Sequence, residues 1–395
     1  MRRILRTVLN PAAVARLRVL RHRLRLATLR AASRSPLLAT LYYLFSSRAF
    51  RREHQAVLHG RLRHEEDNLS DAQSRYRLRR NVHRLEKGLI MQPRRDTFAT
   101  KYIEETVLAL AARVGDPAPA CGDLVLADGA GDDVGDLTTG GGANGGGAAW
   151  VDDDPEEVRW ASGVLQAYFQ AASGHPAIDR ARDRFLALPL QPHAEGLRVA
   201  PFRRDLSQAP PVAYDDLLRL AERRRSVRWF QPRPVPRELI DRAVRVAAES
   251  PSACNRQPFE FRIFDDPEMA LKVASLPMGT RGFEHNFPVV VAVVGRLRAY
   301  FHEKDRHVIY IDGGLASMSF VLALETLGLS SCCINWPDLE PQERGMAALL
   351  GLEPDERVIM LIAVGYPDPQ ALVPASGKKA LDVIRRYNAA APRKA

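Results

Sequence analysis

Cysteine and lysine are both scarce in this chain of 395 residues, but only the scarcity of cysteine limits the class of protein. Four cysteines are too few to hold a chain of this length together, which excludes a disulfide-built secreted fold and favours a reducing, cytoplasmic setting. Lysine supplies only seven of the 57 basic residues, a bias that GC-rich coding explains. No run approaches about 18 uninterrupted apolar residues, so we do not expect a membrane-spanning helix.

Acidic residues are absent from the first 52 positions, where arginine supplies most of the charge. Within residues 12–34, leucines and valines recur at roughly helical spacing among the arginines. We expect a basic helix that packs against a partner or stays solvated, with a peripheral membrane contact as the alternative and no specific nucleic-acid partner. Arg2 and Arg3 suggest a twin-arginine signal, but no signal-like apolar region follows them; a transit peptide stays open.

Composition divides the chain into four regions. We predict a basic helical N-terminal region at 1–114, a Gly/Asp-rich insertion at 115–155, a helical segment with a proline-containing linker at 156–211, and a domain of alternating helices and strands at 212–390. The insertion has too few large apolar residues to offset the entropy of ordering it, so we expect it to be flexible. A phosphate-binding glycine loop is the alternative, but no Lys-Ser/Thr pair follows the glycines.

In the last region, helical periodicity alternates with short β-branched runs. The run at 358–365 has no polar face, which is typical of a strand at the centre of a sheet. We therefore expect helices at 214–224, 236–250 and 312–327, and strands at 259–264, 288–294, 330–335 and 358–365.

Three arginines and a serine follow the first of these helices: Arg224, Arg225, Ser226 and Arg228. Guanidinium groups bind the oxygens of a ribityl phosphate through paired, charge-assisted hydrogen bonds, and a serine hydroxyl can add another. A basic helix end that is favoured by the helix dipole is the competing interpretation.

The loop at 250–259 carries two prolines and several small or amide side chains, including Ser252, Asn255 and Gln257. The pyrimidine edge of a flavin presents alternating donors and acceptors, and an amide side chain can match both kinds. A helix-ending turn would explain the prolines and serines of this loop but not its two amides.

Two further segments complete the candidate site. A tight turn at 328–331 leads into a strand, where Ser331 and the backbone amides can face the flavin N5 and O4. We interpret the neighbouring Cys332 and Cys333 as ordinary core thiols. Lys378 and Lys379 either return to the phosphate or form a surface pair, and the sequence favours neither.

The order and spacing of these motifs resemble those of the FMN-dependent nitroreductase superfamily. Members typically carry an Arg-x-Ser-x-Arg-x-Phe start, a Pro-Ser-x-x-Asn-x-Gln-Pro-aromatic loop, a helix that opens with Asp and small residues, a Gly-Leu-Gly-Ser turn and a closing Gly-Tyr-Pro. This chain shows Arg224 to Phe230, Pro251-Ser252 with Asn255, Gln257 and Pro258, Asp312-Gly313-Gly314, Gly328-Leu329-Ser330-Ser331, and Gly365-Tyr366-Pro367.

The resemblance implies an α+β fold with a mixed, mainly antiparallel sheet flanked by helices, and an intertwined homodimer with FMN at its interface. Phe259 stands where tryptophan is usual, and Ser330 replaces the second glycine of the turn, which leaves the shape of the substrate open. By position, the arginines and Ser226 would hold phosphate and ribityl groups, while Ser252 of the other subunit, Asn255 and Gln257 would line the ring.

We therefore expect an FMN-dependent oxidoreductase that takes hydride from NAD(P)H and reduces an electron-poor small molecule in a ping-pong reaction. The flavin carries this chemistry, so no side chain is named as catalytic. The alternatives are a flavin oxidase or dehydrogenase of a biosynthetic intermediate, and a flavin-free dimeric scaffold whose basic N-terminus binds membrane or nucleic acid. His83 and Glu86 have the spacing of a metal-binding pair, but a single copy favours a solvated helix face.

Overall fold

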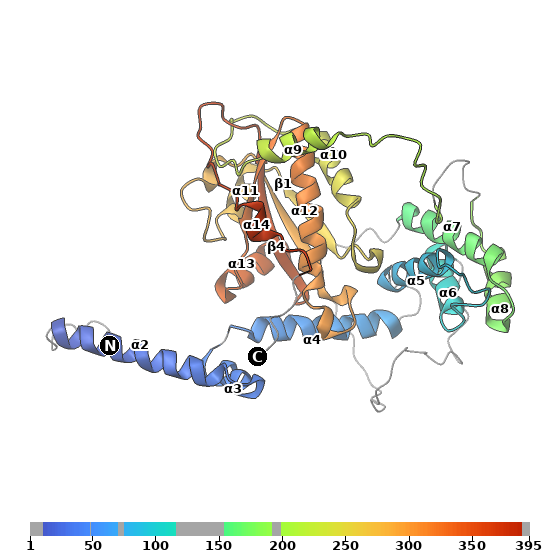
Figure 1. Ribbon diagram of the computed structural model, residues 1–395, viewed down its shortest axis with the longest axis horizontal. Coiled ribbons are helices and arrows are strands. Elements are labelled where there is room, and N and C mark those ends of the chain that lie inside the picture. The colour runs from blue at the N-terminus through green and yellow to red at the C-terminus, as the bar shows by residue number, and fades with distance from the viewer. Residues whose placement is uncertain (1–10, 48, 70–74, 116–153, 192–198, 389–395) are drawn as a thin grey trace.

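The computed structural model describes residues 11–47, 49–69, 75–115, 154–191 and 199–388 (Figure 1). The insertion predicted at 115–155 lies almost entirely outside these residues. Three parts follow one another along the chain: an N-terminal arm, a helical unit and an α+β domain. A single helix, α4, connects the first two parts and packs against the third. The arm and the connecting helix are α2 (Pro11–Ala32), α3 (Pro36–Ser46) and α4 (Arg51–Leu69).

The α+β domain is built on one four-stranded sheet. Its strand order is β1-β2-β4-β3, and all three strand pairs are antiparallel. A parallel bridge between Ser226 and Ser331 adds a short extra segment at the β3 edge, so the predicted mixed, mainly antiparallel sheet is confirmed, with β4 inside it. The strands are β1 (Phe259–Phe264), β2 (Val289–Arg296), β3 (Ser330–Asn335) and β4 (Glu356–Gly365).

Helices cover both faces of the sheet. Side chains alternate along β2: Val289 and Val291 belong to one buried cluster, and Val290 and Ala292 belong to the other. This two-sided burial explains why the strand reads as a continuous apolar run. The helices on the first face are α10 (Arg237–Ala248) and α12 (Val308–Thr326), and those on the second face are α11 (Pro267–Ala274) and α13 (Glu340–Leu350). Two further helices, α9 (Tyr214–Arg223) and α14 (Leu381–Ile384), contribute no side chain to either buried cluster.

Helix α12 begins at Val308, four residues earlier than the sequence predicted, because Gly313 and Gly314 resemble a helix start without being one. By length and composition, the stretch Glu303–Thr326 could cross a membrane, but half of its most apolar window is buried inside the domain. The exposed side of α12 carries Ile311, Leu315 and Met318, which lie on one helical face.

The helical unit stands beside the domain and has its own core (Figure 1). Its helices come from both sides of the segment 116–153, yet they pack together. Tyr168 is fully buried at the centre and donates a hydrogen bond of 2.6 Å to the carbonyl of Phe98. The four helices are α5 (Arg75–Leu89), α6 (Ile103–Arg113), α7 (Pro155–Ala171) and α8 (Pro176–Leu186).

Helix α4 packs closely on the α+β domain. Gly60 lies so near Leu297 that an added Cβ would come within 2.7 Å of the leucine Cβ. Four residues further on, the buried His64 hydrogen bonds through Nδ1 to the carbonyl of Arg298 at 2.8 Å. Ion pairs flank this contact, among them Arg63 to Glu353 at 2.9 Å. The arm is therefore joined to the domain through a firmly held helix.

Candidate functional site

The arginine segment, residues 224–228, was predicted to bind phosphate. It lies beside the start of β3 and the end of β4. The Val227 amide donates to the Ser331 carbonyl at 3.0 Å, and the Gln231 amide donates to the Tyr366 carbonyl at 2.9 Å. Gly365 permits this approach, because a Cβ there would meet the Phe230 ring at 2.8 Å. The structure thus brings three predicted motifs to one end of the sheet: the arginine segment, the turn before β3 and Gly-Tyr-Pro.

Asn286 holds this segment in place, a role that no sequence motif predicts. Its Oδ1 accepts from the Phe230 amide at 2.8 Å, and its Nδ2 donates to the Arg228 carbonyl at 2.9 Å. An asparagine in the polar turn before a strand is an ordinary turn residue in the sequence. Only the fold shows that both ends of its amide are used to hold a backbone 56 residues away.

The guanidinium groups of this segment are not neutralised by any carboxylate in the described parts of the chain. Arg225 donates only to the backbone carbonyl of Arg224 at 2.9 Å, and Arg228 lies over the Phe283 ring at 5.9 Å. Among the described residues, no carboxylate forms an ion pair with Arg224, Arg225 or Arg228, whereas the preceding Arg223 pairs with Glu325. Three uncompensated cations beside two serine residues can bind a multiply charged anion.

Burial raises the pKa of the Cys332 thiol, although Arg228 and Arg224 nearby act to lower it. Both arginines therefore lie near β3. Cys332 is a core thiol as predicted, but Cys333 is exposed, because it points to the opposite side of an edge strand.

The amide loop at 250–259 has a strained backbone. Cys254, Asn255 and Gln257 have φ values of 54°, 51° and 49°, a left-handed conformation that costs a residue with a side chain roughly 1 kcal/mol. Local hydrogen bonds hold it: the Ser252 hydroxyl accepts from the Gln257 amide at 3.0 Å, and Gln257 Nε2 donates to Asn255 Oδ1 at 3.2 Å. The three loop residues predicted to line the ring therefore form one connected group.

Asp312 holds this loop in place by accepting a hydrogen bond from its backbone. The carboxylate is buried in the first turns of α12, accepts from the Ala253 amide at 3.1 Å and accepts from the Tyr300 hydroxyl at 2.6 Å. Burial raises the pKa of Asp312, against the lowering effect of these hydrogen bonds. The sequence marked Asp312 only as the opening of a helix, and its role under the loop is visible only in the fold.

Arg79, which belongs to the helical unit, also holds this loop in place. This buried side chain donates through Nε to the Asn255 carbonyl at 2.8 Å and pairs through Nη1 with Glu157 at 3.1 Å. Its guanidinium also lies over the Trp160 ring at 5.3 Å. Next to it, residues of α5, α10 and β1 line a cavity of about 230 Å³ that reaches Gln257. The N-terminal half of the chain therefore contacts the predicted flavin loop directly.

Within one chain, the two predicted halves of the site lie far apart. The amide loop contacts Asp312 near the start of α12, whereas Arg223, directly before the arginine segment, pairs with Glu325 near the end of the helix. At 1.5 Å per residue, these two positions are about 20 Å apart along the helix axis. Lys378 and Lys379 are exposed, and neither forms a hydrogen bond or ion pair with other described residues.

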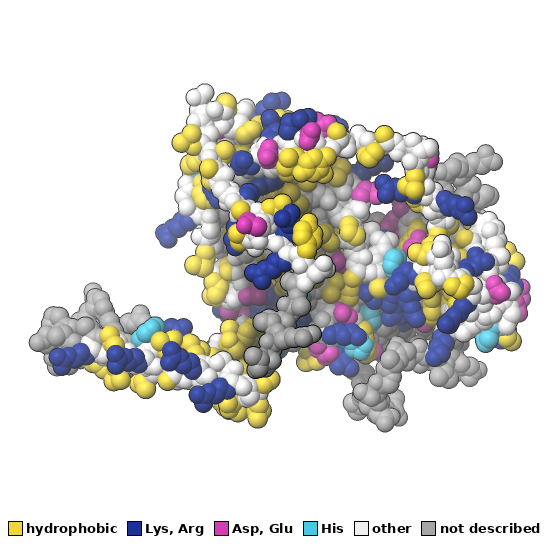
Figure 2. All heavy atoms as spheres, viewed as in Figure 1, with side chains coloured by type: hydrophobic (Ala, Val, Ile, Leu, Met, Phe, Trp, Pro, Cys, Tyr) yellow, Lys and Arg dark blue, Asp and Glu magenta, His cyan; other side chains and the backbone are white. Residues whose placement is uncertain are grey.

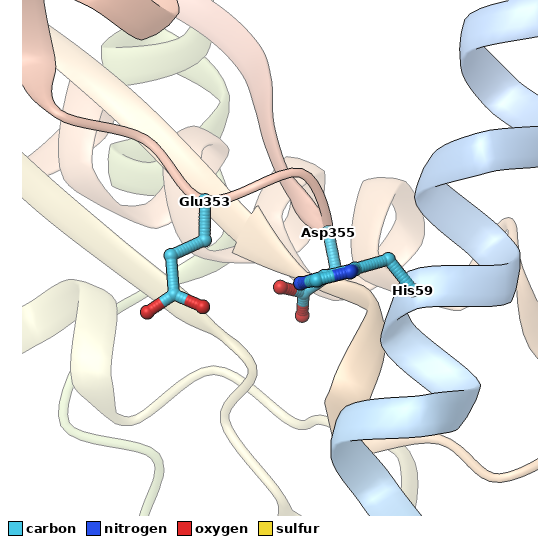
Figure 3. A group of neighbouring side chains, drawn as sticks. All are labelled: His59, Glu353 and Asp355. Atoms are coloured by element: carbon cyan, nitrogen blue, oxygen red, sulfur yellow. The ribbon is translucent and has the colours of Figure 1, made fainter. Parts of the chain in front are cut away.

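Two side-chain groups have the composition of metal sites. His59, Glu353 and Asp355 place ligand atoms within 4.8 Å of one another (Figure 3). However, Arg298 already binds Asp355 through Nε at 2.7 Å and Glu353 through Nη2 at 2.6 Å. A cation would have to displace that guanidinium, so we interpret the group as part of the α4 docking contact.

The pair at His83 and Glu86 is likewise engaged. Glu86 contacts the His83 ring at 3.3 Å and accepts from Trp160 Nε1 at 2.9 Å, which ties α5 to α7. The pair is therefore partly buried between helices rather than on the solvated face expected from the sequence.

Comparison with known proteins places a family match on the α+β domain: residues 221–280 and 274–366 match the nitroreductase family. Iodotyrosine deiodinase 1 from Pongo abelii is 25% identical over 193 residues, which are 42% of this chain and 66% of the relative. A predicted NADH dehydrogenase/NAD(P)H nitroreductase from Methanothermobacter thermautotrophicus is 29% identical over 157 residues, 40% of this chain and 80% of the relative. This chain spans about two thirds of the length of the deiodinases.

Among solved structures, an FMN-dependent nitroreductase from Clostridium difficile is 21% identical, with a TM-score of 0.35 over 44% of this chain and 98% of its own.

Proposed function

Because residues 221–366 form a nitroreductase-family domain, we propose that this protein is a flavoprotein oxidoreductase that binds FMN and acts on a small molecule. The observation that carries the proposal is the trio of arginines at one end of the sheet, which pair with no carboxylate in the part of the chain that the structure describes. Elsewhere in the domain, Arg296 is buried and pairs with Glu356 at 2.8 Å, and the half-buried Arg298 pairs with Asp355. Unpaired guanidinium groups held by a fixed backbone favour a phosphate ligand.

Two groups of residues in this chain would hold the cofactor. Arg224, Arg225 and Arg228 would bind the phosphate, with Ser226 and Ser331 on the adjoining backbone. Asn255 and Gln257 would orient the ring by its polar edge, since their amides can both donate and accept. Bound FMN would supply two-electron transfer between NAD(P)H and an electron-poor acceptor in two successive half-reactions.

A homodimer would bring these two groups of residues together at one cofactor. Because the halves lie at opposite ends of α12, two copies with antiparallel α12 helices would place the loop of one beside the arginines of the other. The exposed Ile311, Leu315 and Met318 on α12 give such a contact an apolar surface. Exposed apolar side chains at the end of the domain, Leu372 and Leu381 among them, fit an intertwined partner.

The acceptor class has two candidates. Likeness to NAD(P)H nitroreductases favours a nitroaromatic acceptor, and likeness to iodotyrosine deiodinases favours a halogenated phenol. Both are electron-accepting small aromatic molecules, so a panel with each class, assayed with NADH and NADPH, would separate them. Flavin reduction by neither nicotinamide, but by an organic donor, would favour the oxidase or dehydrogenase alternative.

The decisive measurement is the absorbance spectrum of the purified full chain. We expect flavin bands, and we expect FMN to be released on denaturation. R224Q/R225Q should bind FMN at least tenfold more weakly, while R219Q, an exposed substitution on α9, should bind as wild type does. A colourless protein that does not bind added FMN would refute the proposal and leave the dimeric scaffold.

A further inference from the structure

The N-terminal arm, α2 and α3, has no buried side chain among its described residues. It extends away from the domain, with α4 as its connection (Figure 1). Its surface is a mixture of apolar and basic side chains, with no acidic side chain visible along it (Figure 2). A two-helix element whose described side chains all lie outside the core of its own chain needs another reason to be helical.

Helix α3 is apolar on almost every side. It reads PLLATLYYLFS, and its side chains are exposed by 68% at Leu37, 57% at Leu44 and 80% at Phe45. A helix that is apolar all round is normally covered by protein or lipid. With 11 residues it is about 16 Å long, too short to cross a hydrocarbon layer of about 30 Å. It is long enough to lie in the interface of one leaflet.

Helix α2 adds positive charge to this apolar segment. Exposed Leu17, Leu20 and Leu24 form one stripe, and arginines occupy much of the remaining surface. Arginine can lay its apolar stem along lipid while its guanidinium stays at the headgroups. The first acid of the chain is Glu53, so the whole arm is cationic: Arg16, Arg18, Arg21, Arg23, Arg25, Arg30 and Arg34.

We propose that α2 and α3 form an interfacial anchor that binds the surface of an anionic lipid bilayer. Charge complementarity selects this occupant. Nucleic acid would satisfy the arginines but leave α3 exposed to water, and a second copy of the arm would bring like charges together. An anionic bilayer covers the apolar helix and neutralises the arginines at once.

The anchor would also hold the domain at the membrane. Arg52 and Glu53, at the start of α4, pair with Glu343 at 3.2 Å and Arg306 at 3.8 Å on the α+β domain. Because these contacts begin directly after the arm, lipid binding by α3 would fix the domain close to the bilayer. This inference is independent of whether the domain binds flavin.

The test is co-sedimentation of the full chain with vesicles of phosphatidylcholine, with and without phosphatidylglycerol. Wild type should bind the anionic vesicles, and less so as salt rises. L41D/L44D and R21Q/R23Q/R25Q should each bind at least tenfold more weakly. The controls L186D, at an exposed leucine of α8, and R203Q/R204Q should bind as wild type does.

Three results would overturn the anchor. The first is failure of wild type to bind anionic vesicles. The second is salt-sensitive binding of nucleic acid without vesicle binding. The third is a lower particle mass for L41D/L44D in the absence of lipid, which would show that a second copy covers α3. Unchanged circular dichroism of each variant separates lost binding from lost folding.

Discussion

Protonation of His64 should weaken the docking of α4 and destabilise the protein below neutral pH. Burial lowers the pKa of His64 from 6.5 to about 4, more than its hydrogen bond to the Arg298 carbonyl raises it. The folded state therefore favours the neutral ring, while the unfolded chain binds a proton near pH 6.5. Stability from this group is complete above pH 6.5 and is lost progressively as pH falls towards 4.

The magnitude follows from the two pKa values. At about 1.4 kcal/mol per unit, the full shift corresponds to roughly 3 kcal/mol. At pH 5, where the unfolded ring is almost fully charged and the folded ring almost neutral, the loss is about 2 kcal/mol. Such a loss is a large fraction of the stability of an ordinary domain.

Urea unfolding at pH 7.5 and pH 5 would measure this loss, with H64N as the matched variant. The asparagine Nδ2 can donate to the same carbonyl but does not titrate in this range. Burial raises the pKa of Asp67 and Asp312, and both carboxyls act in the opposite direction, so the difference between the two proteins is the relevant quantity. An equal acid-induced loss in H64N and wild type would refute the argument.

Three other substitutions test the α4 contact and the surroundings of the candidate site. G60A should lower the urea midpoint by the equivalent of roughly 1–3 kcal/mol, because its Cβ would clash with Leu297, while G279A, in open space, should not. D312N should weaken FMN binding about tenfold in a fluorescence titration, since it removes the charge that holds the amide loop; unchanged affinity would contradict that role. R79M should weaken FMN binding to a similar degree but leave unchanged the affinity for inorganic phosphate, measured by its competition with FMN. Loss of both affinities would point to misfolding.

Much of the fold could be predicted because burial leaves a periodic trace in the sequence. The continuous apolar runs of β2 and β4 identified strands covered on both faces, and the structure confirms them. Helices α11 and α13 were not predicted, because each is short and only one side contacts the sheet. Residues 267–274 form only about two helical turns, which is too short a window to show a clear helical period.

Residues of the candidate site could be proposed from the sequence only where they are close together in the chain. Arginines 224–228 and the amides of 250–259 form local patterns whose chemistry can be read directly. Arg79 and Asp312 could not be recognised, because their function depends on contacts with a loop that is 176 and 59 residues away. The strain at Cys254 was also hidden, since no single residue type marks a left-handed backbone except glycine.

The separation of the two half-sites has a consequence for subunit mixing. If an antiparallel dimer unites them, R224Q/R225Q damages the half-site of its own chain, and D312N damages the half-site that its chain lends to the partner. In a heterodimer of the two variants, one site receives both defects and the other receives none. Mixed subunits should therefore recover up to half of wild-type FMN binding, although each homodimer binds weakly. No recovery in verified heterodimers would show that both half-sites serve ligands of their own chain.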